Sequence, residues 1–201
     1  VIDFSNRGSR GRQRLLRSLF IFGFLSTERT RPVSDLEDAI KKIRLVILDV
    51  DGVLTDGTLL SDMNGNETKS FHVHDGAGIA YLHLAGLKTA VITGRHSKAV
   101  QKRAAELGIE EVYQGEMDKV KCYERILDRL GLGDEAASFM GDDLHDLPVM
   151  LRVGLPIAPA NAREEVKNRA LYVTEASGGN GAVREAVELI LKTQGRWDTI
   201  L

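Results

Sequence analysis

Several features that would indicate a particular class of protein are scarce in this 201-residue sequence. It has a single cysteine, Cys122, which excludes an internal disulfide framework and fits a reducing cytosol. Every apolar run is shorter than the roughly 20 residues that a membrane-spanning helix needs. The net charge of −2 gives no sign of a nucleic-acid or anionic-membrane partner. We therefore expect a soluble cytoplasmic protein that binds neither nucleic acid nor a membrane.

Acidic residues are also scarce at the start of the chain, where the first 31 residues hold seven arginines and two acids. The arginines flank a short apolar run, LFIFGFL, and a basic stretch before such a run is the outline of a secretion signal. No clear small-residue cleavage pair follows it, so we expect residues 1–33 to be a disordered leader or an over-extended start. The rest has enough apolar residues for one folded domain, expected at 34–195, followed by a C-terminal tail at 196–201.

From residue 43 onward, apolar runs typical of strands alternate with helical patterns. The expected strands are RLVILDV, KTAVIT, EVYQ, AASFMG and VGLPIA. The expected helices are GAGIAYLHLAG, SKAVQKRAAELG, KVKCYERILDRLG and DLHDLPVMLR, preceded by a short helix that Ser34 would cap. Gly86, Gly108 and Gly131 fall where helix ends are expected. This alternation predicts an α/β fold, a doubly wound parallel sheet with helices on both faces.

One segment departs from the alternation. GTLLSDMNGNETKSFHV has short runs of alternating polarity on both sides of Asn64-Gly65, and Asn-Gly is the strongest short-range signal for a hairpin. We therefore expect a β-hairpin that projects just after the first strand.

Polar clusters follow four of the expected strands: Asp49 and Asp51; Thr93, Gly94 and Arg95; Lys119; and Asp142, Asp143 and Asp146. Ligands bind beyond the carboxyl ends of the strands in an open α/β sheet, so we expect these side chains to share one site. Carboxylates this close would repel one another, and a hard ion such as Mg²⁺ accepts carboxylate and phosphate oxygens together. The sequence therefore predicts a site for Mg²⁺ and a phosphate group.

The same residue types predict phosphoryl transfer. One of two paired aspartates can attack phosphorus and form an aspartyl-phosphate. The other can protonate the leaving oxygen and then deprotonate the hydrolytic water. Lys119 would offset negative charge on the nucleophile and on the phosphoryl group, while Thr93 would donate a hydrogen bond to phosphate.

In their order along the chain, these clusters resemble the four motifs of the haloacid dehalogenase superfamily of phosphatases: D-x-D, T-G-R, an isolated lysine and G-D-D-x-x-D. The resemblance implies that Asp49 is the nucleophile and that Asp51 is the acid/base, whose backbone carbonyl also meets Mg²⁺. It implies roles for the other matched residues as well: Thr93 and Lys119 hold the phosphoryl group, Asp142 is the remaining metal ligand, and Asp143 and Asp146 are supporting or water-mediated partners.

Within this superfamily, the sequence is similar to the 3-deoxy-D-manno-octulosonate 8-phosphate phosphatases over roughly residues 43–195, including LDVDGVLTDG, DGAGI, ITGR, GDDLHDLPVM and GGNGAVRE. The resemblance implies hydrolysis of an eight-carbon sugar acid phosphate in lipopolysaccharide precursor biosynthesis. It also implies a homotetramer in which hairpins pack together and C-terminal tails help to close neighbouring sites. Independently, only about forty residues separate the first two motifs, which leaves no room for a separate cap domain.

The expected substrate loop departs from the family pattern. The family's loop usually reads N-V-R-D-G-x-G-I-R, whereas residues 72–80 here read HVHDGAGIA, so that His74 and Ala80 replace two arginines. The substrate contacts implied by the resemblance are Asp51, His72, Val73, His74, Asp75, Gly76, Ala80, Gly94, Arg95, Arg103 and Lys119. The departures leave the substrate's identity open. A nine-carbon sugar acid 9-phosphate, of the sialic acid type, is the nearest alternative, and a non-catalytic binding module is the alternative from another class.

The remaining candidates favour structural roles. His72 and His74 are expected to share a strand face, where pocket lining or packing is favoured over a transition-metal pair because the acids suit Mg²⁺ better. His83 and Cys122 are expected to be structural. The glycines of GGNGAVRE indicate a loop, and they would also let a neighbouring backbone approach the substrate.

Overall fold

The computed structural model describes residues 33–65 and 67–200, which belong to a single compact unit. The expected leader, 1–33, lies outside the described residues except for Val33, which begins helix α1 (Val33–Lys42). Ser34 was expected to precede this helix as its cap, and that prediction is wrong because Ser34 lies within the helix. None of the described helices is both long and apolar enough to cross a membrane.

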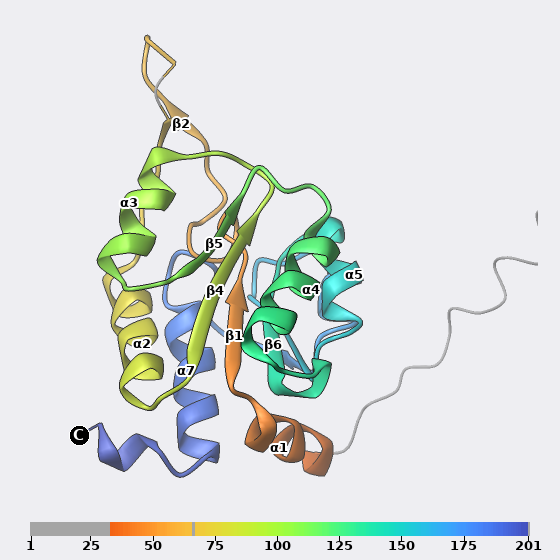
Figure 1. The fold of residues 1–201 in the computed structure, drawn as a ribbon. Coiled ribbons are helices and arrows are strands. Elements are labelled where there is room, and N and C mark those ends of the chain that lie inside the picture. The colour runs from red at the N-terminus through yellow and green to blue at the C-terminus, as the bar shows by residue number, and fades with distance from the viewer. Residues whose placement is uncertain (1–32, 66, 201) are drawn as a thin grey trace, which may run out of the picture. The chain divides into compact units, whose positions relative to one another are not determined.

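A six-stranded parallel sheet, ordered β5-β4-β1-β6-β7-β8, forms the centre of the described unit (Figure 1). Its strands are β1 (Leu45–Leu48), β4 (Lys88–Thr93), β5 (Glu111–Gln114), β6 (Ala137–Met140), β7 (Leu155–Ala158) and β8 (Tyr172–Val173). The first five lie within the predicted runs, whereas β8 was missed because two residues are too short to show a periodic pattern. After β1, the chain adds β4 and then β5 on one side of it, and β6, β7 and β8 then follow on the other side. This is the predicted doubly wound arrangement.

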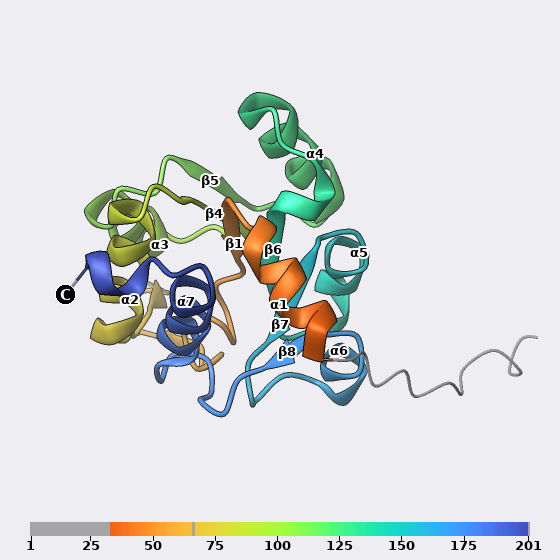
Figure 2. The same ribbon diagram turned by 90° about the horizontal axis from the view of Figure 1, so that it is seen from below.

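Alternate residues of β1 face two different layers of helices. Val46 and Leu48 belong to a buried cluster with α2, α3 and α7, whereas Leu45 and Ile47 belong to a cluster with α4, α5 and α6. These helices are α2 (Val73–Leu84), α3 (Lys98–Glu106), α4 (Lys119–Leu130), α5 (Leu147–Met150), α6 (Glu164–Lys167) and α7 (Ala182–Thr193). Figure 2 shows the two layers on opposite sides of the sheet. Burial of both faces explains why β1 is a continuous apolar run.

Two helix predictions need correction at their boundaries. Helix α2 begins at Val73, three residues before the expected start, and therefore includes His74 and Asp75. The run DLHDLPVMLR was expected to form one helix, but it forms the 3₁₀ turn η2 (Leu144–Asp146) followed by the single turn of α5. The glycines expected at helix ends are confirmed, since Gly86, Gly108 and Gly131 have φ values of 81°, 70° and 63° and follow α2, α3 and α4.

The predicted hairpin is present and projects beyond the carboxyl ends of the strands (Figure 1). Strand β2 (Leu60–Ser61) pairs antiparallel with β3 (Glu67–Thr68), so that Leu60 lies opposite Thr68. The turn between them includes Asn64-Gly65, and Gly65 has a φ of 79°. Apart from this hairpin, the described residues between β1 and β4 form only helix α2 and its connections, which leaves the carboxyl edge of the sheet without a cap domain.

The C-terminal segment packs against its own subunit. Trp197, in the 3₁₀ turn η3 (Trp197–Thr199), meets Tyr81 of α2 edge to face with ring centroids 5.9 Å apart. The guanidinium of Arg184, on α7, lies 5.5 Å from the Trp197 ring. These aromatic and cation–π contacts hold Trp197 on α2 and α7 of the same chain. The tail that reaches a neighbouring site, as the resemblance implied, stays a prediction.

The loop at residues 178–179 packs tightly on the turn that follows β1. A Cβ atom on Gly178 would lie 1.8 Å from the carbonyl oxygen of Gly52. The side chain of Asn161 joins the two turns, donating to the Gly52 carbonyl at 3.0 Å and accepting from the Gly178 amide at 2.6 Å. The predicted close approach of a backbone to these glycines is therefore present, and the backbone that approaches Gly178 and Gly179 is the turn that carries Asp51.

Gly178→Ala should lower the free energy of unfolding by more than about 2 kcal/mol, because the added methyl must displace backbone in both turns. Urea denaturation followed by circular dichroism measures this change. Gly133→Ala is the matched control, since the nearest atoms to its Cβ would belong to the end of the exposed Glu135 side chain, and its cost should stay below about 1 kcal/mol. Equal denaturation midpoints for the two variants would show that the contact between the turns is unimportant.

Candidate active site

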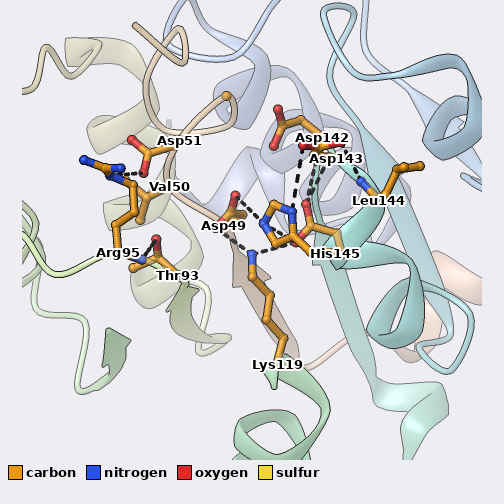
Figure 3. Close-up of polar contacts among 12 residues, drawn as sticks. Asp49, Val50, Asp51, Thr93, Arg95, Lys119, Asp142, Asp143, Leu144 and His145 are labelled. Atoms are coloured by element: carbon orange, nitrogen blue, oxygen red, sulfur yellow. Dashed lines mark hydrogen bonds and ion pairs between the residues drawn. The ribbon is translucent and has the colours of Figure 1, made fainter. Parts of the chain in front are cut away.

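A buried lysine lies at the centre of the carboxyl edge of the sheet. Lys119 Nζ lies 2.8 Å from Asp49 Oδ1 and 2.6 Å from Asp146 Oδ1. Lys119 and Asp49 are each 2% exposed and Asp146 is 0% exposed. Figure 3 shows Lys119 rising from the start of α4 toward Asp49 at the end of β1. Three of the sequence-predicted residues, far apart along the chain, are therefore in direct contact.

The two carboxylates of this triad favour the charged form of Lys119. Burial opposes the charged ammonium of Lys119, but Asp49 and Asp146 outweigh it and raise its pKa. Burial also raises the pKa of Asp49 to about 6, despite the opposing attraction of Lys119. Asp49 is therefore mostly an anion at neutral pH, with one oxygen bound to Lys119 and the other, Oδ2, turned toward His145 at 4.0 Å.

Asp146 organises the loop after β6. Its Oδ1 is bound to Lys119, and its Oδ2 accepts the backbone amides of Asp142 at 3.0 Å and Asp143 at 3.2 Å. One ligand atom each from Asp49, His145 and Asp146 lie within 4.8 Å of one another, a spacing that could hold a metal ion. Both oxygens of Asp146 already have partners, which suits a residue that holds Lys119 and the loop in place better than a metal ligand.

Asp142 is a buried carboxylate with few compensating partners. Its Oδ1 is buried and has no hydrogen-bond partner among the described residues. Burial, together with the charges of Asp49, Asp146 and Asp143, raises its pKa to about 7. The carboxylate lies over Gly52, where a Cβ would come within 2.1 Å of its Oδ2. A cation between Asp142 and Asp49 would relieve this repulsion.

The T-G-R cluster closes β4 beside the same site. The buried hydroxyl oxygen of Thr93 accepts the amide of Arg95 at 3.4 Å, and Arg95 points toward Asp51 (Figure 3). Gly94 lies between them, and a Cβ there would meet only the sulfur of Met117, at 3.2 Å. Helix α3 does not begin until Lys98, so Gly94 and Arg95 lie in a loop after the strand end rather than in the first turn of the helix.

Two residues of the expected substrate loop, Asp75 and Gly76, contact other parts of the same chain. The buried carboxylate of Asp75 accepts the amides of Gly181 at 3.2 Å and Arg184 at 2.8 Å, and so binds the start of α7. Gly76 lies against Arg103, where a Cβ would come within 2.2 Å of its guanidinium. Arg103 also pairs with Glu106 at 3.3 Å. Among the residues that the structure describes, no hydrogen bond or ion pair joins these side chains to Asp49 or Lys119.

The shared strand face expected for His72 and His74 is wrong. His72 precedes α2 and His74 lies in its first turn, with the two rings 5.1 Å apart at nearly right angles. Val73 and Ala80, on the same helix, are exposed to solvent. The structural roles expected elsewhere agree with the structure: His83 Nε2 bonds Thr89 Oγ1 at 2.6 Å, and Cys122 is buried.

Sequence reasoning missed three polar residues at the site, His145, Lys69 and Glu67. His145 lies within GDDLHD, so its position near the site could have been predicted from the sequence. Its approach to Asp49 could not. Glu67 lies in the hairpin strand β3 and Lys69 directly follows that strand. Lys69 and Arg95 contact Asp51, and Glu67 pairs with both of these cations. A charged residue on a projecting hairpin is normally solvated, so nothing in the sequence distinguishes them.

Comparison with known proteins agrees with this geometry. The profile of haloacid dehalogenase-like hydrolases matches residues 108–186. The 3-deoxy-D-manno-octulosonate 8-phosphate phosphatase of Escherichia coli strain K12 is 46% identical over 168 residues, which cover 83% of this chain and 89% of that protein. The crystal structure of the phosphatase of that name from Yersinia pestis has a TM-score of 0.80 and 43% identity, and the match covers 82% of this chain and 89% of that one.

The crystal structure of a third relative contains bound ligands. The 3-deoxy-D-manno-octulosonate 8-phosphate phosphatase of Moraxella catarrhalis, in complex with magnesium, phosphate and a KDO molecule, matches with a TM-score of 0.82 and 40% identity. The match covers 84% of this chain and 97% of that chain. With the motifs, the fold and these relatives in agreement, the chain belongs to the haloacid dehalogenase-like hydrolases and, within them, to the family of 3-deoxy-D-manno-octulosonate 8-phosphate phosphatases.

Proposed function

We propose that this protein is a Mg²⁺-dependent phosphatase that hydrolyses 3-deoxy-D-manno-octulosonate 8-phosphate to the free sugar acid and inorganic phosphate. The observation that carries this proposal is the buried contact of Asp49 with Lys119 at the carboxyl edge of the sheet, in a chain 46% identical to phosphatases of this name. We place the reaction in lipopolysaccharide precursor biosynthesis in the cytoplasm, as the resemblance implies.

Asp49 is the proposed nucleophile. Lys119 holds its Oδ1 at 2.8 Å and so leaves Oδ2 to attack phosphorus, which gives an aspartyl-phosphate and releases the sugar oxygen. The same ammonium offsets the charge that develops on the phosphoryl oxygens, and the Thr93 hydroxyl donates to one of them. Asp51 protonates the leaving oxygen and then takes a proton from the water that hydrolyses the aspartyl-phosphate.

Asp49, Asp142 and the backbone carbonyl of Asp51 would hold Mg²⁺. The buried, unpartnered Oδ1 of Asp142 and its pKa of about 7 fit this role, because both indicate a carboxylate whose charge is not yet compensated. The bound ion supplies positive charge to the phosphoryl oxygens during the transfer. Asp143 lies outside this set and caps η2, accepting the amide of Leu144 at 2.7 Å.

Arg95 is the proposed ligand for the substrate's carboxylate. Its side chain is 48% exposed at the mouth of the site, and its nearest partner is Glu67, 2.5 Å away, which a competing anion could replace. Among the described residues, no hydrogen bond or ion pair joins residues 72–80 or Arg103 to the side chains of Asp49 and Lys119. Besides the catalytic Asp49 and Thr93, we therefore limit the proposed substrate contacts within one subunit to Asp51, Gly94, Arg95 and Lys119.

Asp49→Asn should lower phosphate release from 3-deoxy-D-manno-octulosonate 8-phosphate by more than about 10³-fold, because the amide cannot act as the nucleophile. The substitution is nearly isosteric, so circular dichroism should show an unchanged fold. Asp128→Asn, on the exposed side of α4, is the control and should keep full activity. Retention of most activity by Asp49→Asn would refute the assignment of Asp49 as the nucleophile. If the wild type hydrolysed a nine-carbon sugar acid 9-phosphate faster, that compound would replace the eight-carbon phosphate as the proposed substrate.

Asp142→Asn should stabilise the metal-free protein above neutral pH. The pKa of Asp142 rises from 3.8 to about 7 on folding, so the native state binds more protons than the unfolded state between these values. The wild type therefore loses stability as pH rises through that window, and the variant escapes this loss. At pH 8 in EDTA, we expect the variant to be more stable by on the order of 1 kcal/mol, a value discounted for partial solvation.

Thermal melts at pH 4.5 and pH 8, with and without Mg²⁺, measure this difference. The advantage of the variant should shrink at the lower pH, and Mg²⁺ should stabilise the wild type but not the variant. An equal response of both proteins to Mg²⁺ would exclude Asp142 as a ligand.

A homotetramer assembled through the hairpins is also proposed. Leu59, Leu60 and Met63 are 53%, 51% and 102% exposed on a hairpin whose edges lie open, and both features are normally covered in soluble proteins. Light scattering should give a tetramer for the wild type and a smaller species for Leu60→Asp combined with Met63→Asp. An active wild-type monomer would contradict the assembly.

A further inference from the structure

Asp51, the proposed acid/base, is one of four side chains that form a ring of alternating charge. Asp51 Oδ1 contacts Lys69 Nζ, Lys69 Nζ lies 3.0 Å from Glu67 Oε1, and Glu67 Oε2 lies 2.5 Å from Arg95 Nη2. Arg95 Nε then returns to Asp51 Oδ2 at 3.9 Å, which closes the ring. The ring joins the turn after β1, the hairpin strand β3 with the residue that follows it, and the loop after β4.

The two cations of this ring differ in their surroundings. The Lys69 side chain is 1% exposed and contacts two carboxylates, whereas that of Arg95 is 48% exposed and only loosely approaches Asp51 (Figure 3). Arg95 can therefore turn toward a substrate while Lys69 stays in place. A buried ammonium is costly unless it is paired, so the contacts of Lys69 fix its own position and that of Asp51 together.

We propose that Lys69 is a positioning residue for the phosphatase reaction, and that it holds the Asp51 carboxylate where it can protonate the leaving oxygen. This inference rests on the proposed function. One Asp51 oxygen stays bound to Lys69, and the other becomes available to the leaving oxygen when Arg95 turns to the substrate. The hairpin thereby contributes directly to catalysis within one subunit. Without Lys69, Arg95 alone would remain to offset the carboxylates of Asp51 and Glu67. Because Arg95 lies 3.9 Å from Asp51, it would not hold that carboxylate, and Asp51 would turn away.

Lys69→Met tests the proposal through two substrates that differ in their leaving group. An alkoxide leaving group needs a proton, whereas p-nitrophenolate leaves without one. The ratio kcat/KM reports the steps up to departure of the leaving group, so it isolates protonation from hydrolysis of the aspartyl-phosphate. For the sugar acid phosphate we expect a loss of about 10–100-fold, and for p-nitrophenyl phosphate a loss below about 3-fold. Lys69→Arg keeps the positive charge. Its ratio of kcat/KM for the sugar acid phosphate to kcat/KM for p-nitrophenyl phosphate should therefore be closer to the wild-type ratio than that of Lys69→Met.

A double variant shows whether Lys69 acts through Asp51. In an Asp51→Asn background, Lys69→Met should lower single-turnover cleavage of the sugar acid phosphate by less than about 3-fold, because no acid remains to be positioned. Equal losses for both substrates, or a full additional loss in the double variant, would overturn the proposal and indicate a structural or substrate-binding lysine.

Lys41→Met, an exposed lysine of α1 with ion pairs at 3.9 Å, is the matched control and should change neither rate. If Lys69→Met does not fold, Lys69→Ser carries the same test, since it admits water between the two carboxylates. A wild type that hydrolyses neither substrate would refute the proposed function, whereas an active wild type with equal losses would refute only the role of Lys69.

Discussion

The ammonium of Lys119 between Asp49 and Asp146 is the interaction on which the site depends. It draws together the end of β1, the first residue of α4 and the turn after β6. Two carboxylates buried without this cation would repel each other and lose their hydration, and removal of one partner from such a group leaves an uncompensated buried charge. Asp146 extends the arrangement, because its second oxygen fixes the backbone that carries Asp142.

The parallel sheet supplies the rigidity that this charge cluster needs. Both faces of β1 are buried under helices, so the position of Asp49 is set by the core rather than by a loop. Asp51, in the turn that follows, is partly exposed. This turn is held from two sides: Asn161 and Gly178 pack against Gly52, while Lys69 contacts Asp51. The proposed nucleophile is thus fixed by the sheet, and the proposed acid/base is fixed by side chains from other parts of the chain.

The sequence was most informative where local pattern and chemistry coincide. The apolar run of β1 and the polar clusters after the strands predicted both the sheet and the residues brought together at its edge. Long-range pairing was not predictable, since nothing local to Asp75 shows that its carboxylate will bind the start of α7, more than a hundred residues later. The same limit hid Lys69, whose burial arises only when the hairpin lies against Asp51. His72 and His74 were misplaced for another reason, because α2 begins earlier than its apolar pattern indicates.

Covalent transfer of the phosphoryl group to Asp49 is the central claim, because the triad and the magnesium ligands derive their roles from it. Rapid acid quenching during turnover of 3-deoxy-D-manno-octulosonate 8-phosphate, followed by peptide mass spectrometry, tests it most directly. The account predicts one phosphoryl group on the peptide that contains β1, localised to Asp49 by fragmentation. A phosphoryl group on another side chain, or rapid turnover with no trapped adduct at any quench time, would contradict it.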